Sequence, residues 1–324
     1  MAEFNMHMEL MFMMRVMNLS HITKHATRPQ HRTPVRNFNM TALSFEVFPP
    51  KSIDAGFRLW DTVQALTPLE PRFFSVTYGA GGSTQDLTHE AAQTLRRSSG
   101  LPVAAHLTCV GATREKVLKT AAKFADAGIT DIVALRGDPV DGTDFQQVEG
   151  GFANSIELVE ALADTGRFTI RVGAYPESHA DAADSAQNIA WLKAKIDAGA
   201  SEAITQFFFE AETFLRFRDA CVKAGITAPI VPGILPVGNW ASIQKFASQC
   251  GADVPVTLAQ GFENAARDGN SDLFALAHCT EMCDELRSEG VDALHFYTLN
   301  RPDLTREACR ALGLIPAAAM RNVA

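Results

Sequence analysis

The sequence predicts an α/β fold, a (β/α)8 TIM barrel behind an N-terminal extension that we expect to be disordered. From residue 43 onward, eight β-rich runs alternate with helical runs, which is the strand count of such a barrel. Several helical runs end at a glycine just before the next strand, as in DAGIT-DIVAL. A doubly wound sheet is the alternative, but neither G-x-G-x-x-G nor G-x-x-x-x-G-K-S/T occurs, and YGAGGST at 78–84 fits neither spacing. We therefore favour the barrel.

Each predicted strand is short and rich in β-branched and aromatic residues. In chain order the strands are LSFEVF at 43–48, RFFSVTY at 72–78, PVAAHLT at 102–108, DIVALR at 131–136, TIRVGAY at 169–175, EAITQFF at 202–208, PIVPGI at 229–234 and ALHFYT at 293–298. The segments between them carry helical patterns, for example REKVLKTAAKFADAG and SAQNIAWLKAKIDAGA. This alternation predicts one barrel domain, residues 41–324.

The first 40 residues differ in composition from the rest of the chain. They hold eight of the ten methionines, and residues 1–39 carry five Lys and Arg against two acidic residues. The apolar stretch MELMFMMRVM is interrupted by Arg15 and no small-residue cleavage site follows it, so a secretory signal is not expected. A transit peptide is an alternative, because transit peptides are also poor in acidic residues and carry scattered arginines. We favour a disordered extension or an over-long start, with the folded part beginning at Met40.

Charge and composition exclude several classes of function. The formal net charge is −8 and no Lys/Arg cluster lies outside the extension, so we expect no nucleic-acid binding. No apolar run reaches the roughly 18 residues that span a membrane. The six cysteines form no CxxC pair, which is typical of free thiols in a reducing compartment, and we predict a cytoplasmic protein. HCTEMC at 278–283 could suggest a metal site, but no second ligand pair completes it, so we predict helix packing and no metal.

Polar residues follow most of the predicted strands, where TIM-barrel enzymes carry their catalytic groups. They are Glu46, Thr77, Tyr78, His106, Arg136, Gly137, Asp138, Tyr175, His179, Gln206, Tyr297 and Arg301. Each alone has a structural explanation: His106 could be a core histidine, Tyr175 an edge residue and Asp138 a turn residue. Their coincidence at one rim predicts an active site.

Glu46 lies in the middle of the apolar stretch SFEVFPPK. Strand alternation places Phe45 and Val47 on one face and Glu46 on the other, and Pro49-Pro50 end the strand. We therefore expect Glu46 near the barrel mouth among apolar neighbours. Desolvation there would raise the pKa of its carboxyl, which could then act as a general acid. The alternative is a buried salt bridge to an Arg or Lys.

Eight motifs occur in order between about residues 43 and 315. They are SFEVFPPK, FFSVTYGAGG, AAHLTC, DIVALRGD, GAYPESH, AITQFFFEAETFLRFRD, PGILPV and HFYTLNR. Together they resemble the bacterial type of 5,10-methylenetetrahydrofolate reductase, and their order makes the resemblance specific although no single motif is decisive. The resemblance covers the catalytic barrel only. The extension has no counterpart, and the regulatory domain of eukaryotic relatives is lacking, so inhibition by S-adenosylmethionine is not expected.

The resemblance implies a flavoprotein whose barrel mouth holds FAD without a Rossmann unit. NADH or NADPH would reduce the flavin and leave. Methylenetetrahydrofolate would then be reduced to 5-methyltetrahydrofolate, a ping-pong scheme that feeds methionine synthesis within one-carbon metabolism. The substrate's five-membered ring must first open to an iminium, which requires a proton on N10, and Glu46 would supply it. We also expect a homo-oligomer.

The resemblance further implies a role for each matched residue. Besides Glu46, the catalytic residue would be Asp138, which would stay ionised and stabilise the cationic iminium. The FAD-binding residues would be Thr77, Tyr78, Ala80, His106, Arg136, Gly137, Asp138, Tyr175, His179, Ala182, Asn188 and Lys195. Substrate would be bound by Gln206 at the pterin or nicotinamide, by Arg301 at the glutamate tail of folate, and by Phe246 through stacking.

Two positions depart from the family pattern. Asn188 stands where we expect an acidic residue on the flavin ribose, and Ser242 where we expect a glutamine, although Gln244 is close by. These changes concern local affinity rather than the reaction. Two other functions remain as alternatives, a flavin-independent TIM-barrel lyase and a non-catalytic folate-binding subunit. The lyase is disfavoured because no predicted strand end carries a lysine for a Schiff base.

Overall fold

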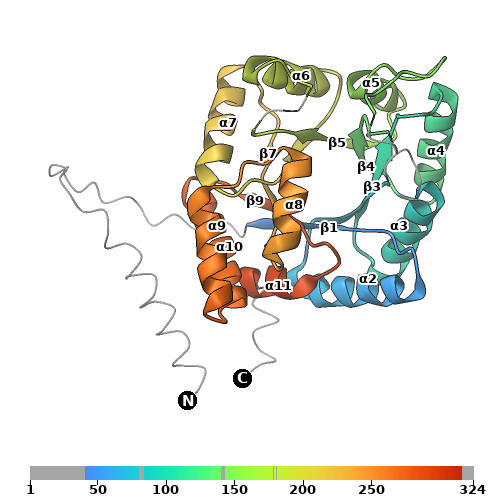
Figure 1. Ribbon diagram of the computed structural model, residues 1–324. Coiled ribbons are helices and arrows are strands. Elements are labelled where there is room, and N and C mark those ends of the chain that lie inside the picture. The colour runs from blue at the N-terminus through green and yellow to red at the C-terminus, as the bar shows by residue number, and fades with distance from the viewer. Residues whose placement is uncertain (1–40, 80–83, 140–142, 178, 180, 316–324) are drawn as a thin grey trace, which may run out of the picture. The chain divides into compact units, whose positions relative to one another are not determined.

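The computed structural model describes residues 41–315, apart from 80–83, 140–142, 178 and 180. These residues form a ring of parallel strands enclosed by helices, and Figure 1 looks roughly along the axis of that ring. The predicted TIM barrel is confirmed. The predicted extension, residues 1–40, and the predicted cofactor-binding residue Ala80 lie outside the described residues.

The strands follow the predicted runs closely, with one exception. They are β1 (Ala42–Val47), β2 (Phe73–Val76), β3 (Val103–Thr108), β4 (Asp131–Leu135), β5 (Thr169–Ala174), β6 (Glu202–Thr205), β7 (Ile230–Val231), β8 (Gly233–Ile234) and β9 (Ala293–Tyr297). The single strand predicted at 229–234 is wrong, because Pro232 divides it into β7 and β8. Proline has no amide hydrogen to donate to a neighbouring strand.

The divided segment closes the barrel. Neighbouring strands run in the order β7-β6-β5-β4-β3-β2-β1-β9-β8. The two ends of this series belong to the same short segment, with β7 paired to β6 and β8 paired to β9. All pairs are parallel, so the carboxyl ends of the strands meet at one rim, the barrel mouth.

Helices surround the strands and begin and end at recognisable signals. They are α2 (Ile53–Leu66), α3 (Gln85–Ser99), α4 (Arg114–Asp126), α5 (Ser155–Asp164), α6 (Ser185–Asp197), α7 (Ala211–Lys223), α8 (Trp240–Cys250), α9 (Val256–Arg267), α10 (Ser271–Ser288) and α11 (Pro302–Ala311), with a short 3-10 helix, η2 (Thr67–Leu69), after α2. The Ser52 hydroxyl caps α2 by accepting from the Ala55 amide at 3.2 Å. Gly100, at a φ of 70°, ends α3 as the sequence predicts.

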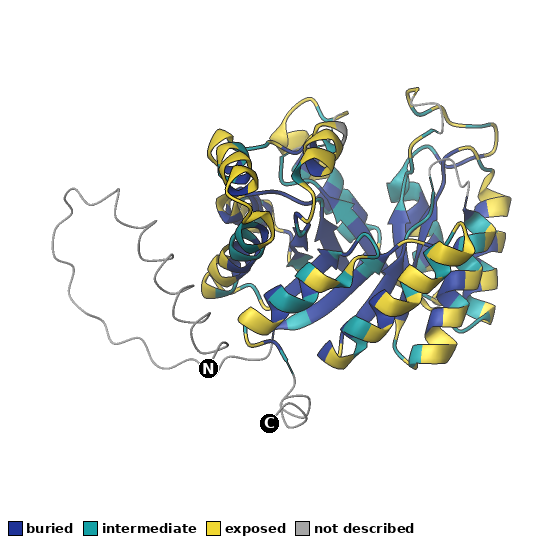
Figure 2. Ribbon diagram, turned by 60° about the horizontal axis from the view of Figure 1, so that its bottom comes forward, coloured by how far each residue is buried: buried dark blue, intermediate teal, exposed yellow. Residues whose placement is uncertain are grey.

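The main hydrophobic core lies between the strands and the helices. Phe45 and Val47 of β1 are fully buried in it, whereas Ser44 and Glu46 face the barrel interior. Figure 2 shows the same division across the barrel, with buried strands inside helices that expose only their outer faces. The predicted alternation in SFEVFPPK is therefore confirmed.

A buried ion cluster closes the barrel at the end opposite the mouth. Arg171 of β5 pairs with Glu202 of β6 at 2.9 Å and with Asp131 of β4 at 2.6 Å. Glu202 also accepts from Arg72 at 2.8 Å, and the Phe73 ring lies 4.1 Å from the Arg171 guanidinium carbon. Every charge in the cluster has a partner, which a charge in a barrel interior requires. The cluster therefore stabilises this end of the barrel, and we expect the catalytic residues at the opposite end.

The cysteines pack into the core. Cys279 and Cys283 of α10 and Cys309 of α11 are buried, which agrees with helix packing of HCTEMC. All six cysteines are unpaired. Within the described residues, no three His, Cys, Asp or Glu side chains are grouped as metal ligands. None of the helices in this part of the chain is long and apolar enough to cross a membrane.

Candidate active site

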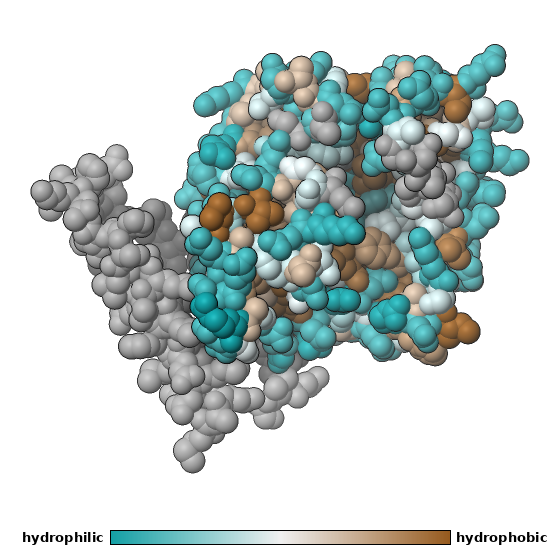
Figure 3. All heavy atoms as spheres, viewed as in Figure 1, coloured by the Kyte–Doolittle hydropathy of each residue, from teal (hydrophilic) through white to brown (hydrophobic). Residues whose placement is uncertain are grey.

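A cavity of about 220 Å³ opens at the barrel mouth. It is lined by Glu46 from β1, His106 from β3, Gln206 after β6, Phe246 of α8, and Tyr297 of β9. These residues come from distant parts of the chain and meet because parallel strands end at one rim. In the space-filling view, apolar side chains lie in the recessed middle of this face and hydrophilic ones dominate its rim (Figure 3).

Glu46 lies between two imidazoles in this cavity. The Glu46 Oε2 atom is 3.3 Å from His106 Nε2 and 3.9 Å from His295 Nε2. The longer distance exceeds that of a hydrogen bond, and His295 Nε2 has no hydrogen-bond partner among the described residues. The Ser44 hydroxyl fixes the other side of the ring, lying 2.7 Å from His295 Nδ1. Strands β1, β3 and β9 thus hold one carboxylate and two histidines together.

The predicted rise in the pKa of Glu46 is wrong for the free protein. Burial does raise the pKa, but the two imidazoles, His106 before His295, outweigh burial and lower it to about 2. Burial lowers the pKa of His295, although the nearby Glu46 acts against that effect. The carboxyl is therefore ionised in the free protein. Histidines stabilise it, rather than the Arg or Lys that the alternative hypothesis supposed.

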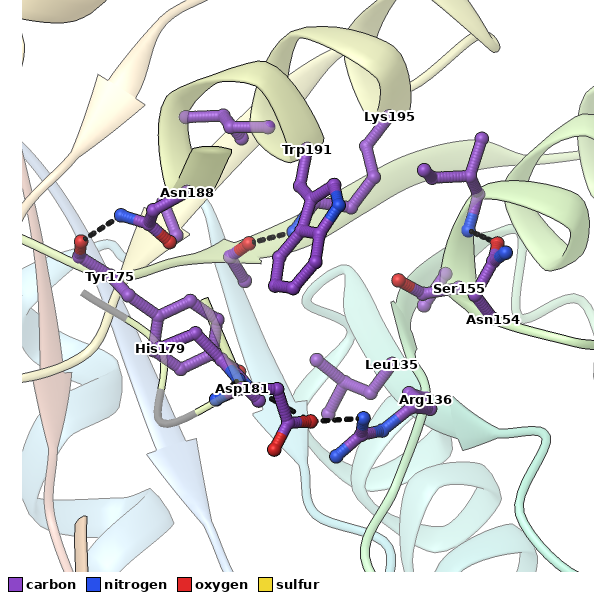
Figure 4. A pocket seen from close by; sticks show the side chains of 15 residues that line it. Leu135, Arg136, Asn154, Ser155, Tyr175, His179, Asp181, Asn188, Trp191 and Lys195 are labelled. Carbon is purple, nitrogen blue, oxygen red and sulfur yellow. Dashed lines mark hydrogen bonds and ion pairs between the residues drawn. The ribbon is translucent and has the colours of Figure 1, made fainter. Parts of the chain in front are cut away.

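A second hollow of about 230 Å³ adjoins the first. The two share Leu135, Gly173, Ala174 and Tyr175 as a common wall. The second hollow is lined by the predicted residues Arg136, Tyr175, His179, Asn188 and Lys195. Figure 4 shows these side chains converging from the ends of β4 and β5 and from α6. The structure therefore brings five of the twelve predicted cofactor-binding residues together beside the mouth.

Lys195 gives this hollow a buried positive charge. Its side chain is only 8% exposed, and its ammonium donates to the Gly173 carbonyl. Burial lowers the pKa of Lys195 to about 8. Within the described residues Lys195 forms no ion pair with a carboxylate. Arg136, by contrast, pairs with Asp181 and lies 3.6 Å from Asp138. Lys195 is therefore the cation that remains available to an anionic ligand.

Aromatic rings form the other wall of this hollow. Tyr175 and His179 meet edge to face at 4.6 Å, and His179 lies 6.3 Å from Trp191. Burial raises the pKa of Tyr175 to about 12, so its hydroxyl remains neutral. The amide of Asn188 donates to the Tyr175 carbonyl at 2.7 Å. That bond needs an NH2 group, which the acidic residue expected at this position lacks.

The remaining predicted residues lie outside both hollows. Tyr78 lines a small separate hollow, and burial raises its pKa to about 12. Arg301 is exposed and lines a groove between α2 and α11. Asp138 is 84% exposed at its side chain, beside Arg136. Thr77, Gly137 and Ala182 lie in loops that follow β2, β4 and β5.

Gly137 supports the loop that carries Asp138. Its φ is +81°, and a Cβ atom there would lie 2.7 Å from side-chain carbons of Thr108 and Val110. No other residue fits this position without displacing its neighbours. The glycine therefore fixes how the chain leaves β4 and enters the loop that carries Asp138.

Three residues at the site were not predicted from the sequence. His295 could have been found, because its neighbour in register on β1 is Ser44 and alternation turns both inward. Trp191 lies one turn before Lys195 on α6 and lines the same hollow. Asp181 neutralises Arg136 from a loop, and no sequence signal indicates that contact.

Fold and site together define a TIM-barrel enzyme whose mouth places a buried carboxylate beside a cationic, aromatic hollow. The chain belongs to the methylenetetrahydrofolate reductase family, because the family model of that description matches residues 33–313. This membership confirms the resemblance and supports the reduction of methylenetetrahydrofolate as the reaction.

Individual relatives agree with the family assignment. A 5,10-methylenetetrahydrofolate reductase of Pectobacterium carotovorum is 43% identical over 277 residues, 85% of this chain and 91% of that protein. The Escherichia coli protein of the same name is 40% identical, with the same coverage. The Arabidopsis thaliana methylenetetrahydrofolate reductase (NADH) 1 is 37% identical over 85% of this chain but only 49% of its own length.

A solved structure matches the fold at low sequence identity. It is a Clostridium thermocellum protein described as binding two copies of 5-methyl-5,6,7,8-tetrahydrofolic acid. The TM-score is 0.54 at 12% identity, over 85% of this chain and 95% of that one. This similarity supports the barrel architecture alone.

Proposed function

We propose that the chain is an FAD-dependent methylenetetrahydrofolate reductase that uses NADH or NADPH in a ping-pong mechanism. The observation that carries the proposal is the shared wall between the two hollows. A cofactor held by the second hollow would present its reactive ring to a substrate beside Glu46. The product, 5-methyltetrahydrofolate, would supply methionine synthesis. That the protein forms a homo-oligomer and is cytoplasmic remains a prediction from the sequence.

The residues of the second hollow fit FAD. A phosphate-bearing ligand requires a cation, and Lys195 is buried there with no carboxylate partner in the described chain. A ribose requires hydrogen-bonding groups, and the Oδ1 atom of Asn188 can still accept because its NH2 group makes the bond to Tyr175. When bound, FAD would supply the hydride transfer. Arg136, His179 and Lys195 would hold and orient it, and Gly137 would let the loop pass close by.

Glu46 would deliver the proton that opens the folate ring. Folate N10 needs a neutral carboxyl, whereas the free protein holds a carboxylate. A substrate covering the mouth excludes water from Glu46, and desolvation is already the largest influence raising its pKa. We propose that binding therefore draws a proton onto Glu46. His106, with Nε2 at 3.3 Å, is the nearest group that could pass one to it.

Other residues of the mouth would bind and orient the pterin. Gln206 lines the cavity, where its amide could hydrogen-bond a pterin or a nicotinamide. Phe246 is 37% exposed and stacks on Phe207 at 5.5 Å, so its outer face is available to a second ring. Asp138, at the rim, would contribute negative charge to a cationic iminium.

The proposal is tested by separating the two half-reactions. Purified protein should be yellow or acquire a flavin spectrum with added FAD. Under anaerobic conditions NADH or NADPH should bleach that spectrum and methylenetetrahydrofolate should restore it. Well-folded protein that takes up no flavin would contradict the proposal and favour a lyase. Flavin uptake without either half-reaction would favour a non-catalytic folate-binding subunit.

A further inference from the structure

The barrel sheet is interrupted just before Gln206, one of the residues that line the mouth. The pairing of β6 with β7 ends at Ile204 and Val231, and Pro232 then separates β7 from β8. The next residue of β6, Thr205, lies beyond this last pair and is fully buried. Because a buried carbonyl needs a hydrogen-bond partner, Thr205 must find one outside the pairing of these two strands.

Tyr297 of β9 supplies that partner. Its hydroxyl donates to the Thr205 carbonyl at 2.6 Å, while the Gly233 amide of β8 donates to the Thr205 hydroxyl at 2.9 Å. Burial raises the pKa of Tyr297, so its hydroxyl keeps the proton that it donates. The two bonds join β6 to β8 and β9 across the interruption in the sheet.

Gly233 leaves room for this contact. A Cβ atom on Gly233 would lie 2.1 Å from the Thr205 carbonyl oxygen and 2.5 Å from a ring carbon of Tyr297. Another residue at this position would therefore displace the strand backbone or the tyrosine ring. The Tyr297 ring also packs edge to face against Phe207 and His295, with ring centroids 6.5 Å and 5.4 Å away. These contacts hold the hydroxyl against the Thr205 carbonyl.

The peptide that Tyr297 fixes is the one that leads into Gln206. Its carbonyl is that of Thr205, and its amide, that of Gln206, donates to the Ala174 carbonyl of β5 at 2.8 Å. Both polar groups of this peptide are therefore bound. In the mouth, the Gln206 Oε1 atom accepts from the Phe207 amide at 3.0 Å. The NH2 group of Gln206 can donate to a ligand, and a pterin and a nicotinamide both carry a carbonyl oxygen that accepts.

We propose that Tyr297 is a positioning residue, which acts through Thr205 to fix Gln206 for both ligands of the mouth. The inference rests on the proposed function and makes it more specific, because it explains how one amide serves two half-reactions. If the end of β6 were loose, each ligand would have to order the backbone as well as the Gln206 side chain on binding. Tyr297 therefore sets the affinity of the mouth for its ligands rather than the rate of the chemical step.

The test is a double-mutant cycle of Tyr297→Phe and Gln206→Ala in the FAD-loaded protein. Single-turnover rates of each half-reaction, measured against the concentration of NADH, NADPH or methylenetetrahydrofolate, give an apparent dissociation constant and a limiting rate. Tyr297→Phe should raise the dissociation constants of nucleotide and folate about two- to tenfold, as expected for one lost hydrogen bond, and change the limiting rates less than about twofold. In the Gln206→Ala background, Tyr297→Phe should raise neither constant further.

Ser201→Ala is the matched control. The Ser201 hydroxyl also donates to a carbonyl of the neighbouring strand, that of Ile170 at 3.0 Å, but at the end of the barrel opposite the mouth. This variant should leave both dissociation constants at the wild-type values. Urea unfolding of Ser201→Ala and Tyr297→Phe measures the stability that each bond contributes, which separates a loss of stability from a change in affinity.

The outcomes separate this inference from the function on which it rests. Wild-type protein that shows neither half-reaction would refute the proposed function. With both half-reactions present, the positioning role is refuted if Tyr297→Phe or Gln206→Ala keeps the wild-type dissociation constant for either ligand. It is also refuted if the two substitutions act independently in the double variant, or if Ser201→Ala raises the constants as much as Tyr297→Phe does.

Discussion

The Ser44 hydroxyl lies 2.7 Å from His295 Nδ1, and the two residues are neighbours in register on β1 and β9. This contact holds the His295 ring with Nε2 toward Glu46. When the hydroxyl donates to Nδ1, the proton of a neutral imidazole is on Nε2 and faces the carboxylate. Ser44 thus acts on Glu46 through His295, as a positioning residue.

We expect Ser44→Ala to slow folate reduction about two- to tenfold, the cost of one buried hydrogen bond. Reduction of the flavin by NADH or NADPH should be unaffected, because that half-reaction does not need the proton from Glu46. Stopped-flow measurement of both half-reactions checks this. Ser75→Ala is the matched control, since the Ser75 hydroxyl is also buried beside Glu46 but has no hydrogen-bond partner in the described structure. Equal slowing by both variants would argue against the positioning role.

Glu46→Gln should abolish folate reduction and leave nucleotide oxidation intact. Glutamine keeps the shape of the side chain but cannot donate a carboxyl proton, and general acids typically contribute about 10²–10⁴-fold. Anaerobic single-turnover kinetics of each half-reaction would measure the difference. Folate turnover at the wild-type rate would exclude Glu46 as the acid.

Lys195→Met should weaken FAD binding about tenfold or more, because the phosphates would lose their buried cation. Flavin retained after gel filtration, and the dissociation constant from fluorescence quenching, measure this effect without an activity assay. Lys193→Met is the control on the same helix, since Lys193 is 42% exposed at its side chain and pairs with Asp197 instead. Undiminished flavin affinity in Lys195→Met would remove Lys195 from the cofactor site.

Glu202→Gln should destabilise the barrel by about 3–5 kcal/mol, because it leaves the buried Arg171 only partly compensated. Urea unfolding followed by circular dichroism measures the free energy. For comparison, Asp197→Asn removes the exposed pair with Lys193 and should cost below about 1 kcal/mol. Similar losses of unfolding free energy in both variants would mean that the buried cluster stabilises the protein no more than an exposed ion pair does.

His278 should make stability fall as the solution becomes more acidic. Burial lowers its pKa from 6.5 to about 4. Between these values the unfolded chain binds the proton and the folded protein does not, so acid favours unfolding. We expect His278→Leu to lose less stability than wild type between pH 7 and pH 4.5, measured by urea titration at each pH. An identical pH dependence in both proteins would contradict this assignment.

Local patterns determined most of the barrel. Glycine stops and β-rich runs located the strands, because these signals act over a few residues. Alternation around Glu46 correctly predicted which side chains face inward. The predicted strand at 229–234 failed at Pro232, because proline has no amide hydrogen to donate to a neighbouring strand.

The sequence alone did not predict the electrostatics of the site. The sequence places Glu46 among apolar neighbours, which predicts a raised pKa, yet its nearest titratable neighbours are His106 and His295. A pKa depends on groups within a few ångströms, and those groups come from strands far apart in the chain.

The sequence by itself determined the family, the barrel and the catalytic candidate, since each rests on residue order and short-range periodicity. Only the tertiary structure decided that Glu46 is held as a carboxylate by two histidines, and that Arg301 lines the groove with Arg58 rather than the mouth. The physical reason is that packing of parallel strands and neighbouring helices sets which charges meet, and sequence distance carries no information about that contact.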